Sequence, residues 1–235
     1  LEFRRVLFRS GQAGALENAQ GMPLMPSFYA QPTWTWAAWV KITGGAGGFI
    51  EILNTYDAPS LNPTSIYVSD TQILWMGPGN SQAGTVAIND GQWHHVAFTK
   101  NSVSPLDFTS GNLVLYVDGL PIALSGGANP SGVNPGANNR RIYPGGLGFL
   151  SPPLSGSLRM AEIYFCNTVR TQSDIQNILM TGQVGTADGA WDRTMYIVPT
   201  QGDMVDVAGG ISANNSANNT YTSFNGVTLV NDSPL

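Results

Sequence analysis

Two adjacent histidines, His94 and His95, first suggest chemistry, because imidazole is a common metal ligand and general base. They lie in segment 92–99, whose aromatic and β-branched residues predict a strand. Neighbouring residues of a strand point to opposite faces of its sheet, so the two rings cannot hold one ion. The pattern favours a structural role for both, with Trp93 as a core anchor, and assigns no metal ligands.

A second group of residues has the chemistry that binds sugars. Aromatic rings stack on the apolar face of a pyranose, and amide and carboxylate groups bind its hydroxyls, in some proteins through calcium. The residues that supply these groups in one stretch are Asn54, Tyr56, Asp57, Tyr67 and Trp75. We expect the first three in a loop at a sheet edge, and the last two on the strands that follow. The alternative for Tyr67 and Trp75 is a place in the core or on an unremarkable surface.

Nucleophilic catalysis requires a serine or cysteine served by a histidine and a carboxylate. No spacing in the sequence indicates such a set, so we expect no catalytic residues. Cys166 is the only cysteine, which excludes an intramolecular disulfide and a cysteine-built zinc site. It follows the strand-like run 163–165, a position typical of a buried, inert thiol.

The composition is that of a folded, β-rich chain. Of 235 residues, 42% are hydrophobic and 11% charged, which excludes the high-charge composition of disordered proteins. The 28 glycines and 15 prolines punctuate the sequence at short intervals, as turns between strands do. The length fits one sizeable β-sandwich or two small domains.

The charge balance limits the partners. The net charge is −5, and no Lys/Arg cluster has the size that phosphate neutralisation requires, so we expect no nucleic-acid partner. No run of eighteen apolar residues occurs, and we therefore expect no membrane span. Residues 1–10 contain three of the ten basic residues and resemble translated adapter or vector sequence. We expect them to lie outside the fold.

Short segments of β-branched and aromatic residues recur between turn residues, and this spacing predicts a sandwich or barrel. The predicted strands are 33–42, 49–53, 65–68, 72–76, 84–88, 92–99, 112–117 and 121–124. Asp118-Gly119 is preferred in type I′ hairpin turns, so Asp118 is predicted to be a turn residue. The Gly-, Asn- and Pro-rich stretch 125–148 predicts a long surface loop.

One helix interrupts the β pattern. Thr171 and Asp174 have the spacing of a capping box, in which each residue satisfies a backbone N–H of the other. Apolar residues at helical spacing follow, and Gly182 can end the helix. Beyond it, segment 191–199 is strand-like, whereas 207–220 is mostly Gly, Ala, Ser and Asn. The segment 186–235 therefore supplies either further strands of the same sandwich or a linker.

The order of these signals resembles the laminin-G-like and pentraxin-like branch of the concanavalin-A-like lectin/glucanase superfamily. The resemblance covers about residues 20–185. Its motifs are Trp-Ala-Ala-Trp-Val-Lys at 36–41, Asp-Gly-Gln-Trp-His-His-Val-Ala at 90–97, Leu-Tyr-Val-Asp-Gly at 115–119, and 156–167 leading into the helix. The second and third motifs are specific as a pair.

The resemblance implies two antiparallel sheets whose edge loops bind sugars or calcium, but it does not imply one activity. Relatives that cleave β-glucans carry a Glu-x-Asp-x-Glu pattern on one strand face. No such pattern occurs here, since Leu53 follows Glu51 and Tyr164 follows Glu162 at the second position. The stretch 157–160 also lacks the family's usual aspartate after the late glycine, which argues against a calcium role there.

The sequence thus predicts an all-β, antiparallel jelly-roll sandwich of the concanavalin-A-like type, with one short helix near 172–181. We expect a sandwich over 11–185 that acts as a non-catalytic, carbohydrate-binding module of an extracellular, cell-surface or virion protein. Its partner would be a glycan or glycosylated surface, with calcium as the candidate cofactor. The alternatives are a structural or adhesive module that contacts proteins in a larger assembly, and a glycoside hydrolase of the same fold.

Overall fold

The computed structural model describes thirteen segments of the chain, and all structural statements below concern them. These segments are 13–15, 24–26, 32–44, 50–57, 60–77, 80–103, 111–126, 139–144, 156–166, 168–181, 195–200, 203–206 and 228–230. Residues 1–10, which we expect to resemble adapter or vector sequence, are not among the described segments. Strands dominate the described chain, as the sequence predicts.

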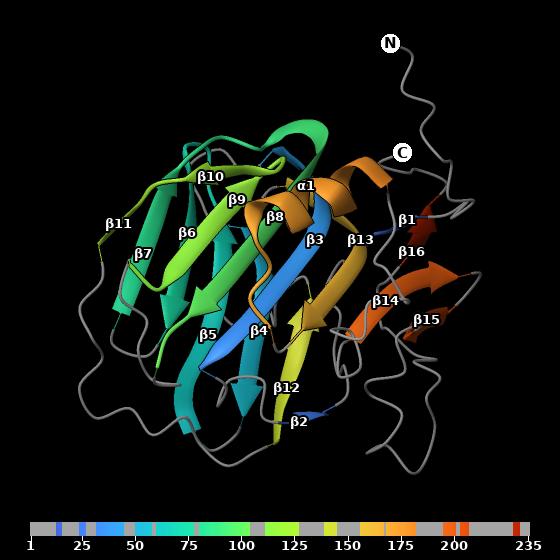
Figure 1. Cartoon of the computed structure of the whole chain (residues 1–235). Helices are drawn as coiled ribbons and strands as arrows, with labels where there is room; N and C mark the ends of the chain where they lie inside the picture. The colour runs from blue at the N-terminus through green and yellow to red at the C-terminus, as the bar shows by residue number, and fades with distance from the viewer. Residues whose placement is uncertain are drawn as a thin grey trace.

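The larger sheet has nine strands in antiparallel pairs (Figure 1). They are β1 (Ala13–Ala15), β3 (Thr33–Gly44), β8 (Asp90–Asn101), β9 (Leu113–Val117), β10 (Leu120–Ile122), β13 (Gly156–Cys166), β14 (Met195–Thr200), β15 (Asp203–Asp206) and β16 (Thr228–Val230). The order is β10-β9-β8-β3-β13-β1-β16, while β14 pairs with β13 and β15 with β14. Strands from both ends of the sequence therefore belong to the same sheet.

The smaller sheet has seven strands, also in antiparallel pairs. They are β2 (Leu24–Pro26), β4 (Ile50–Asp57), β5 (Ser60–Val68), β6 (Gln72–Gly77), β7 (Asn80–Thr85), β11 (Leu124–Gly126) and β12 (Asn139–Pro144). The order is β11-β7-β6-β5-β4-β12-β2. The four central strands form a meander, and the chain crosses between the two sheets from β10 to β11.

The core lies between the two sheets. Trp36, Phe98 and Leu115 are paired across β3, β8 and β9, and all three are fully buried. A Cβ added to Gly84 on β7 would lie 2.6 Å from Cδ2 of Leu115. Gly84 therefore faces the nine-stranded sheet, and its missing side chain lets the two sheets approach closely.

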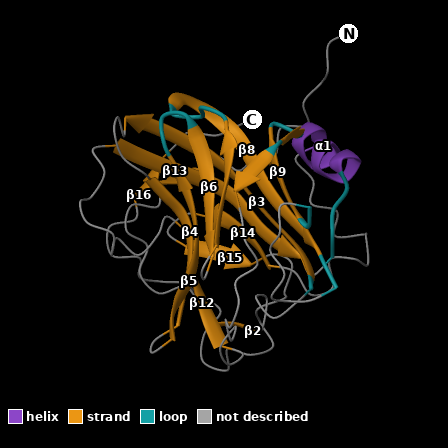
Figure 2. Ribbon diagram, turned by 90° about the vertical axis from the view of Figure 1, so that its left-hand side faces the viewer, coloured by secondary structure: helices purple, strands orange, loops and turns teal. Residues whose placement is uncertain are grey.

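Helix α1 (Gln172–Thr181) covers the other face of the nine-stranded sheet (Figure 2). Ile175 and Ile178 are buried in a cluster with Ala37, Ala97, Tyr116 and Cys166. Ala37 and Ala97 are Cα partners on β3 and β8, and their small side chains leave room for the helix. Burying an isoleucine side chain contributes about 1.5–3 kcal/mol, so this cluster is a substantial second core.

The helix begins as its sequence predicts. The Thr171 backbone N–H donates to the Asp174 carboxylate at 2.8 Å, and the Asp174 N–H donates to the Thr171 hydroxyl at 3.2 Å. These reciprocal bonds form a capping box and confirm the predicted start. The helix runs over the predicted residues 172–181.

Two sequence expectations, one about a loop and one about a strand, are corrected. The stretch 125–148 is not one loop, because it holds the last two residues of β11 and all of β12. Pairing of β12 with both β2 and β4 overrides the loop-like composition of the surrounding stretch. The strand predicted at 84–88 lies earlier, as β7, and ends at Thr85. The strand-like segment near 195 is confirmed as β14, which pairs with β13.

Candidate functional site

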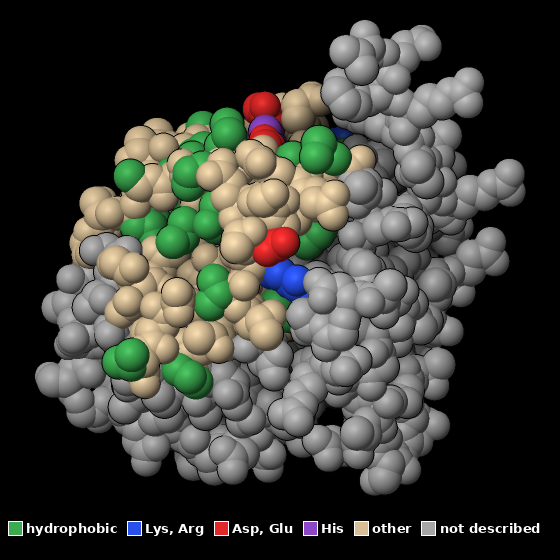
Figure 3. Space-filling view, in the orientation of Figure 1, with side chains coloured by type: hydrophobic (Ala, Val, Ile, Leu, Met, Phe, Trp, Pro, Cys, Tyr) green, Lys and Arg blue, Asp and Glu red, His purple; other side chains and the backbone are tan. Residues whose placement is uncertain are grey.

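An acid–histidine–acid cluster lies at one rim of the sandwich, formed by Asp90, His94 and Asp118. The His94 Nδ1 atom lies 2.8 Å from Asp118 Oδ2, and its Nε2 lies 3.1 Å from Asp90 Oδ1. Figure 3 shows histidine atoms next to acidic atoms at the upper edge of the molecule. Both ring nitrogens are thus engaged by carboxylates, which fastens the start of β8 to the turn between β9 and β10.

Backbone conformation positions both carboxylates. Asp118 and Gly119 have φ values of 51° and 76°, as the predicted type I′ turn requires. Asp118 Oδ1 accepts the backbone N–H of His95 at 2.9 Å, and Asp90 Oδ1 accepts that of Gln92 at 2.8 Å. Asp118 is therefore a turn residue, as predicted, and also a partner of both histidines, which the sequence interpretation missed.

The cluster favours a protonated His94 between two carboxylates. The hydrogen bond to Asp118 raises the pKa of His94 above its ordinary value, against the opposing effect of burial. The backbone N–H of Gln92 is the main cause that lowers the pKa of Asp90. Burial acts to raise the pKa of Asp118, but the hydrogen bonds from His94 and the His95 N–H outweigh it and leave the pKa lowered.

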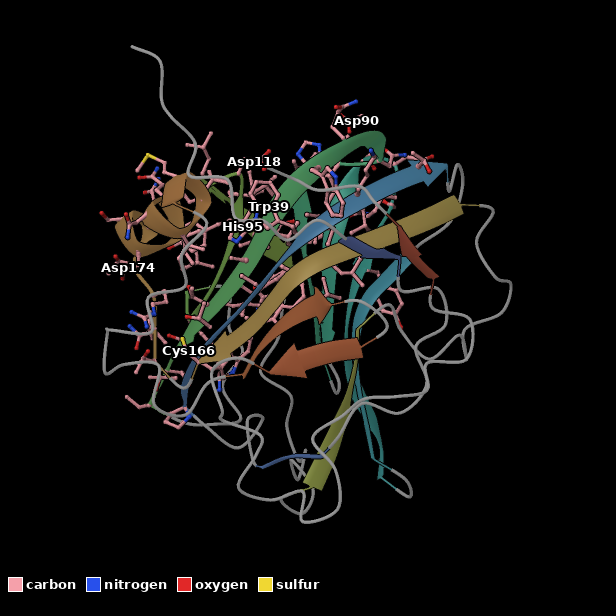
Figure 4. The ribbon with its side chains drawn as sticks, turned by 90° about the vertical axis from the view of Figure 1, so that its right-hand side faces the viewer. Trp39, Asp90, His95, Asp118, Cys166 and Asp174 are labelled. Carbon is pink, nitrogen blue, oxygen red and sulfur yellow. The ribbon has the colours of Figure 1, made fainter. Side chains whose placement is uncertain are left out.

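His95 lies on the opposite face of β8, under the helix. It is fully buried, and its ring centroid lies 5.3 Å from that of Trp39 in an edge-on arrangement. Trp39 in turn packs against Trp93 and Leu179 of α1. Figure 4 shows Asp118, Trp39 and His95 close together beside the helix. Burial lowers the pKa of His95 to about 4, so the ring is neutral at pH 7.

Hydrogen bonds next to the cluster of Asp90, His94 and Asp118 connect this rim to helix α1 and to the seven-stranded sheet. Gln172 and Gln176 of α1 donate to the carbonyl oxygen of Gly119 at 3.2 and 3.1 Å. On the other side, the Asn89 amide donates to Asp70, in the turn between β5 and β6, at 3.0 Å. Within the described segments, no three His, Cys, Asp or Glu side chains are arranged to hold a metal ion. The arrangement is suited to joining three layers of the fold.

The residues predicted for sugar binding lie on the seven-stranded sheet. Asn54, Tyr56 and Asp57 belong to β4 and not to a loop, which corrects that expectation. The strand extends this far because it pairs with β5 on one side and β12 on the other. Their side chains lie outside the described part of the structure.

The two aromatic residues of the predicted set lie on the next strands. Tyr67 on β5 is only 6% exposed, which corrects the expectation of a ring available for stacking. Trp75 on β6 is in register with Ile66 and Gln82, both buried. This register agrees with the alternative of a core position for Trp75, whose side chain is outside the described set.

Register assigns the remaining residues to a face of this sheet. Gly84 faces the core and pairs with Ile73, which pairs with Val68 on β5. Ile66, two residues before Val68, shares that face and pairs with Leu53 of β4. Asn54 and Tyr56 alternate with Leu53 along β4, so they occupy positions on the outer face.

Strand β12 adds two residues to that outer face. Across the β4–β12 pair, Asn54 is opposite Tyr143, and Tyr56 is opposite Arg141. Directly opposed residues share a face in an antiparallel pair. We call these four residues the β4–β12 block. Sequence interpretation missed Arg141 and Tyr143 because they fall in the stretch predicted to be a loop.

Comparison with protein families identifies the fold independently. Residues 18–176, more than half of the chain, match the laminin-G model of the concanavalin A-like lectin/glucanases superfamily. The chain belongs to this superfamily. The match confirms the resemblance carried by the Trp-His-His-Val-Ala and Leu-Tyr-Val-Asp-Gly motifs, and it fits the jelly-roll sandwich described above.

Solved structures of the superfamily's fold are similar to this chain at low identity. A Bacteroides ovatus protein, provisionally assigned as carbohydrate-binding, is 17% identical, with a TM-score of 0.57 over 94% of this chain and 59% of its own. A Trypanosoma rangeli sialidase in complex with 2,3-difluorosialic acid is 16% identical, with a TM-score of 0.52 over 72% of this chain and 27% of its own. This chain therefore spans less than two thirds of either protein, and the likeness establishes the fold.

No curated protein matches the sequence significantly. In the described segments, no helix is long and apolar enough to cross a membrane.

Proposed function

We propose that this chain is a non-catalytic, carbohydrate-binding module whose partner is a glycan or a glycosylated surface. The observation that supports this most directly is the fold match over 94% of the chain to a protein provisionally assigned as carbohydrate-binding. Membership of a lectin/glucanase superfamily agrees with it. A setting outside the cell, on a cell surface or on a virion, is the one in which such a module meets glycans.

The outer face of the seven-stranded sheet is the proposed binding surface. The β4–β12 block combines two tyrosines with an amide and a guanidinium at adjacent register positions. Aromatic and amide groups are the ones that recognise sugar rings and their hydroxyls. Asp57 ends β4 beside this block. Its carboxylate is a ligand type that calcium prefers, so we include calcium as a candidate cofactor at this end of the strand.

A glycan array, run with and without a chelator, tests the proposal. We expect the full chain to retain a defined group of glycans, and Tyr56→Ala to weaken that binding about tenfold or more, since an aromatic contact is worth about 1–3 kcal/mol in comparable stacking sites. Val103→Ala is the control, because Val103 is fully exposed just beyond β8 of the other sheet. Loss of binding with the chelator would assign calcium.

Other results would point to the alternatives. Absence of any retained glycan, together with stable self-association, would contradict glycan binding and favour a structural or adhesive module. Release of reducing sugar from a bound oligosaccharide would contradict the non-catalytic role and favour a hydrolase.

A further inference from the structure

Both acids of the acid–histidine–acid cluster are followed by glycine. Asp-Gly occurs three times in the chain, at 90, 118 and 188, and the described segments contain the first two pairs. Asp-Gly is chemically labile, because glycine has no side chain to keep its backbone nitrogen from attacking the carboxyl carbon of the aspartate. The two described pairs share this local chemistry, so a difference in their reactivity comes from the fold.

The carboxylate of Asp90 is folded over its own main chain. Its Oδ1 accepts the backbone N–H of Gln92, two residues later, at 2.8 Å. This bond forms an Asx turn, and the ring that it closes contains the Gly91 nitrogen. The carboxyl carbon is therefore held on the side of the nitrogen that would attack it. The side chain of Asp90 is also 57% exposed, so water reaches it.

The main chain at Gly91 departs from the regular ladder. Trp93 of β8 is opposite Lys41 of β3. Asp90, three residues before Trp93, is opposite Thr43, which is only two residues after Lys41. Strand β8 thus has one extra residue here, and such a bulge disrupts the ladder hydrogen bonds locally. The Asp90–Gly91 peptide is therefore less constrained than a peptide inside a regular ladder.

The carboxylate of Asp118 is held away from its own main chain. Its Oδ1 accepts the backbone N–H of His95 at 2.9 Å, and its Oδ2 lies 2.8 Å from His94 Nδ1. Both partners are on β8, whereas the next residue, Gly119, is fixed by its turn and by two hydrogen bonds from α1 to its carbonyl oxygen. Figure 4 shows Asp118 beside the helix and Asp90 at the edge of the molecule. The fold therefore opposes at Asp118 the reaction that it favours at Asp90.

We propose that Asp90 is a site of spontaneous isomerisation to isoaspartate. The Gly91 nitrogen attacks the carboxyl carbon of Asp90, and the new N–C bond closes a succinimide ring. One carboxyl oxygen leaves as water, which takes the Gly91 amide proton and a second proton from protonated His94, whose Nε2 lies 3.1 Å from Asp90 Oδ1. A water molecule then adds to the main-chain carbonyl carbon of the ring and breaks its bond to the Gly91 nitrogen, which gives isoaspartate. Addition at the other carbonyl carbon restores aspartate.

The product alters the rim. Isoaspartate places its Cβ in the main chain and moves the free carboxylate to a new position. Residue 90 therefore loses the bonds that its carboxylate makes to Gln92 and His94. His94 keeps its contact with Asp118, so isomerisation removes one of the two acids that hold its ring.

Tryptic peptides of the aged protein test the inference. Trypsin cuts after Lys41, Lys100 and Arg140, so Asp90 and Asp118 fall in separate peptides, 42–100 and 101–140. The full chain is incubated at neutral pH, and isoaspartate in each peptide is measured by enzymatic methylation and by electron-transfer mass spectrometry. We expect isoaspartate to form about tenfold or more faster at residue 90 than at residue 118.

The unfolded chain is the control for local sequence. In guanidinium chloride both Asp-Gly pairs lose their structure and should isomerise at similar rates. Asp90→Glu should abolish isoaspartate in peptide 42–100, because its longer side chain cannot form the succinimide ring. Asp70→Glu is the matched control, with the same change at the same rim and in the same peptide, and should leave the rate at residue 90 unchanged. Thermal unfolding of each variant checks that it is folded.

A third variant tests the proton donor. His94→Gln should slow isomerisation at residue 90 about tenfold or more in the folded chain, because an amide does not supply the second proton. An unchanged rate in this variant would overturn the role of His94. Equal rates at residues 90 and 118 in the folded chain, or the same ratio of rates in the folded and unfolded chains, would overturn the inference itself.

Discussion

His94 and His95 are neighbours on strand β8, yet their side chains lie in opposite environments. His94 is at the rim, with 17% of its side chain exposed and a carboxylate at each ring nitrogen. His95 is fully buried against Trp39, beneath the helix-covered face. The surroundings raise the pKa of His94 and lower that of His95 to about 4.

The difference shows that strand pleat, more than residue type, determines the chemistry of this pair. Alternation places one imidazole between two acids and the other in a dry layer. One proton therefore stabilises the fold at His94 and destabilises it at His95. The following changes test how far the two environments are independent.

The largest expected effect comes from removing the ring that covers His95. Trp39 is 6% exposed and packs against Trp93 and Leu179. Trp39→Ala should lower the free energy of unfolding by about 4 kcal/mol, measured by urea denaturation, because it leaves a cavity in this layer. Admission of water should also raise the pKa of His95 from about 4 toward its ordinary value, measured by NMR. A His95 pKa that stays near 4 in this variant would show that other groups keep the site dry.

A smaller effect comes from pH. The folded pKa of His95, about 4, lies below the ordinary histidine value of 6.5, so the unfolded chain binds more protons between these limits. The free energy of unfolding should therefore fall by about 3 kcal/mol as pH falls from 7 to 4, because His95 gains its proton more readily in the unfolded chain. His95→Gln should flatten that part of the profile of unfolding free energy against pH. His94 acts in the opposite sense, because its contribution is present below pH 6.5 and lost as pH rises through its raised pKa.

His94→Gln is the matched comparison for the same profile. It should remove the loss of stability above pH 6.5 and leave the fall between pH 7 and pH 4 in place, because His95 remains. Identical profiles for the two variants would contradict the assignment of opposite roles to the two histidines.

The smallest effect is expected at the rim. Asp118→Asn preserves a turn residue that tolerates positive φ and retains an acceptor for the His95 N–H, but removes the charge facing His94. The free energy of unfolding at pH 6 should fall by about 1 kcal/mol, because this partly exposed pair is screened by water. The pKa of His94 should fall, since the Asp118 hydrogen bond is the main cause that raises it.

Asp70→Asn is the control for that change. Asp70 accepts a hydrogen bond from Asn89 at the same rim, so the variant removes a charge there without altering either carboxylate that contacts His94. An equal fall in the His94 pKa in both variants would mean that the field of the whole rim, and not the contact with Asp118, sets its titration.

The sequence predicts most accurately where structure is decided locally. The type I′ turn at Asp118-Gly119 and the capping box of Thr171 and Asp174 depend on residues within a few positions of one another. Segments of β-branched and aromatic residues likewise identified β3 and β8, whose pairing forms much of the core. The family motifs then joined these local elements into the correct fold.

Long-range pairing limited the rest of the prediction. Strand β12 lies in a stretch whose Gly, Asn and Pro content favours a loop, and it forms because β2 and β4, which are far away in the sequence, pair with it. Pairing of β4 with β5 and β12 likewise makes the predicted loop at Asn54 and Asp57 the end of β4. Burial of Tyr67 depends on neighbours that periodicity does not reveal.

The contact between His94 and Asp118 also could not be predicted from the sequence. These residues are 24 positions apart, and the connection from β8 to β9 is not a tight turn that would fix the register. The predicted turn placed Asp118 correctly at the end of β9, but only the observed pairing of Val96 with Val117 brings it beside the histidines.

The pairing of β13 has a practical consequence for where this protein can be cut. The family match ends at residue 176, halfway through α1, whereas Ile178 and Leu179 pack on the sheet beyond that point. Strand β13 also borders β1 and β14, which both lie outside the matched region. A fragment trimmed to 18–176 would lose half of α1 and would leave the backbone of β13 open to pairing with other chains. A stable fragment therefore needs residues on both sides of the matched region.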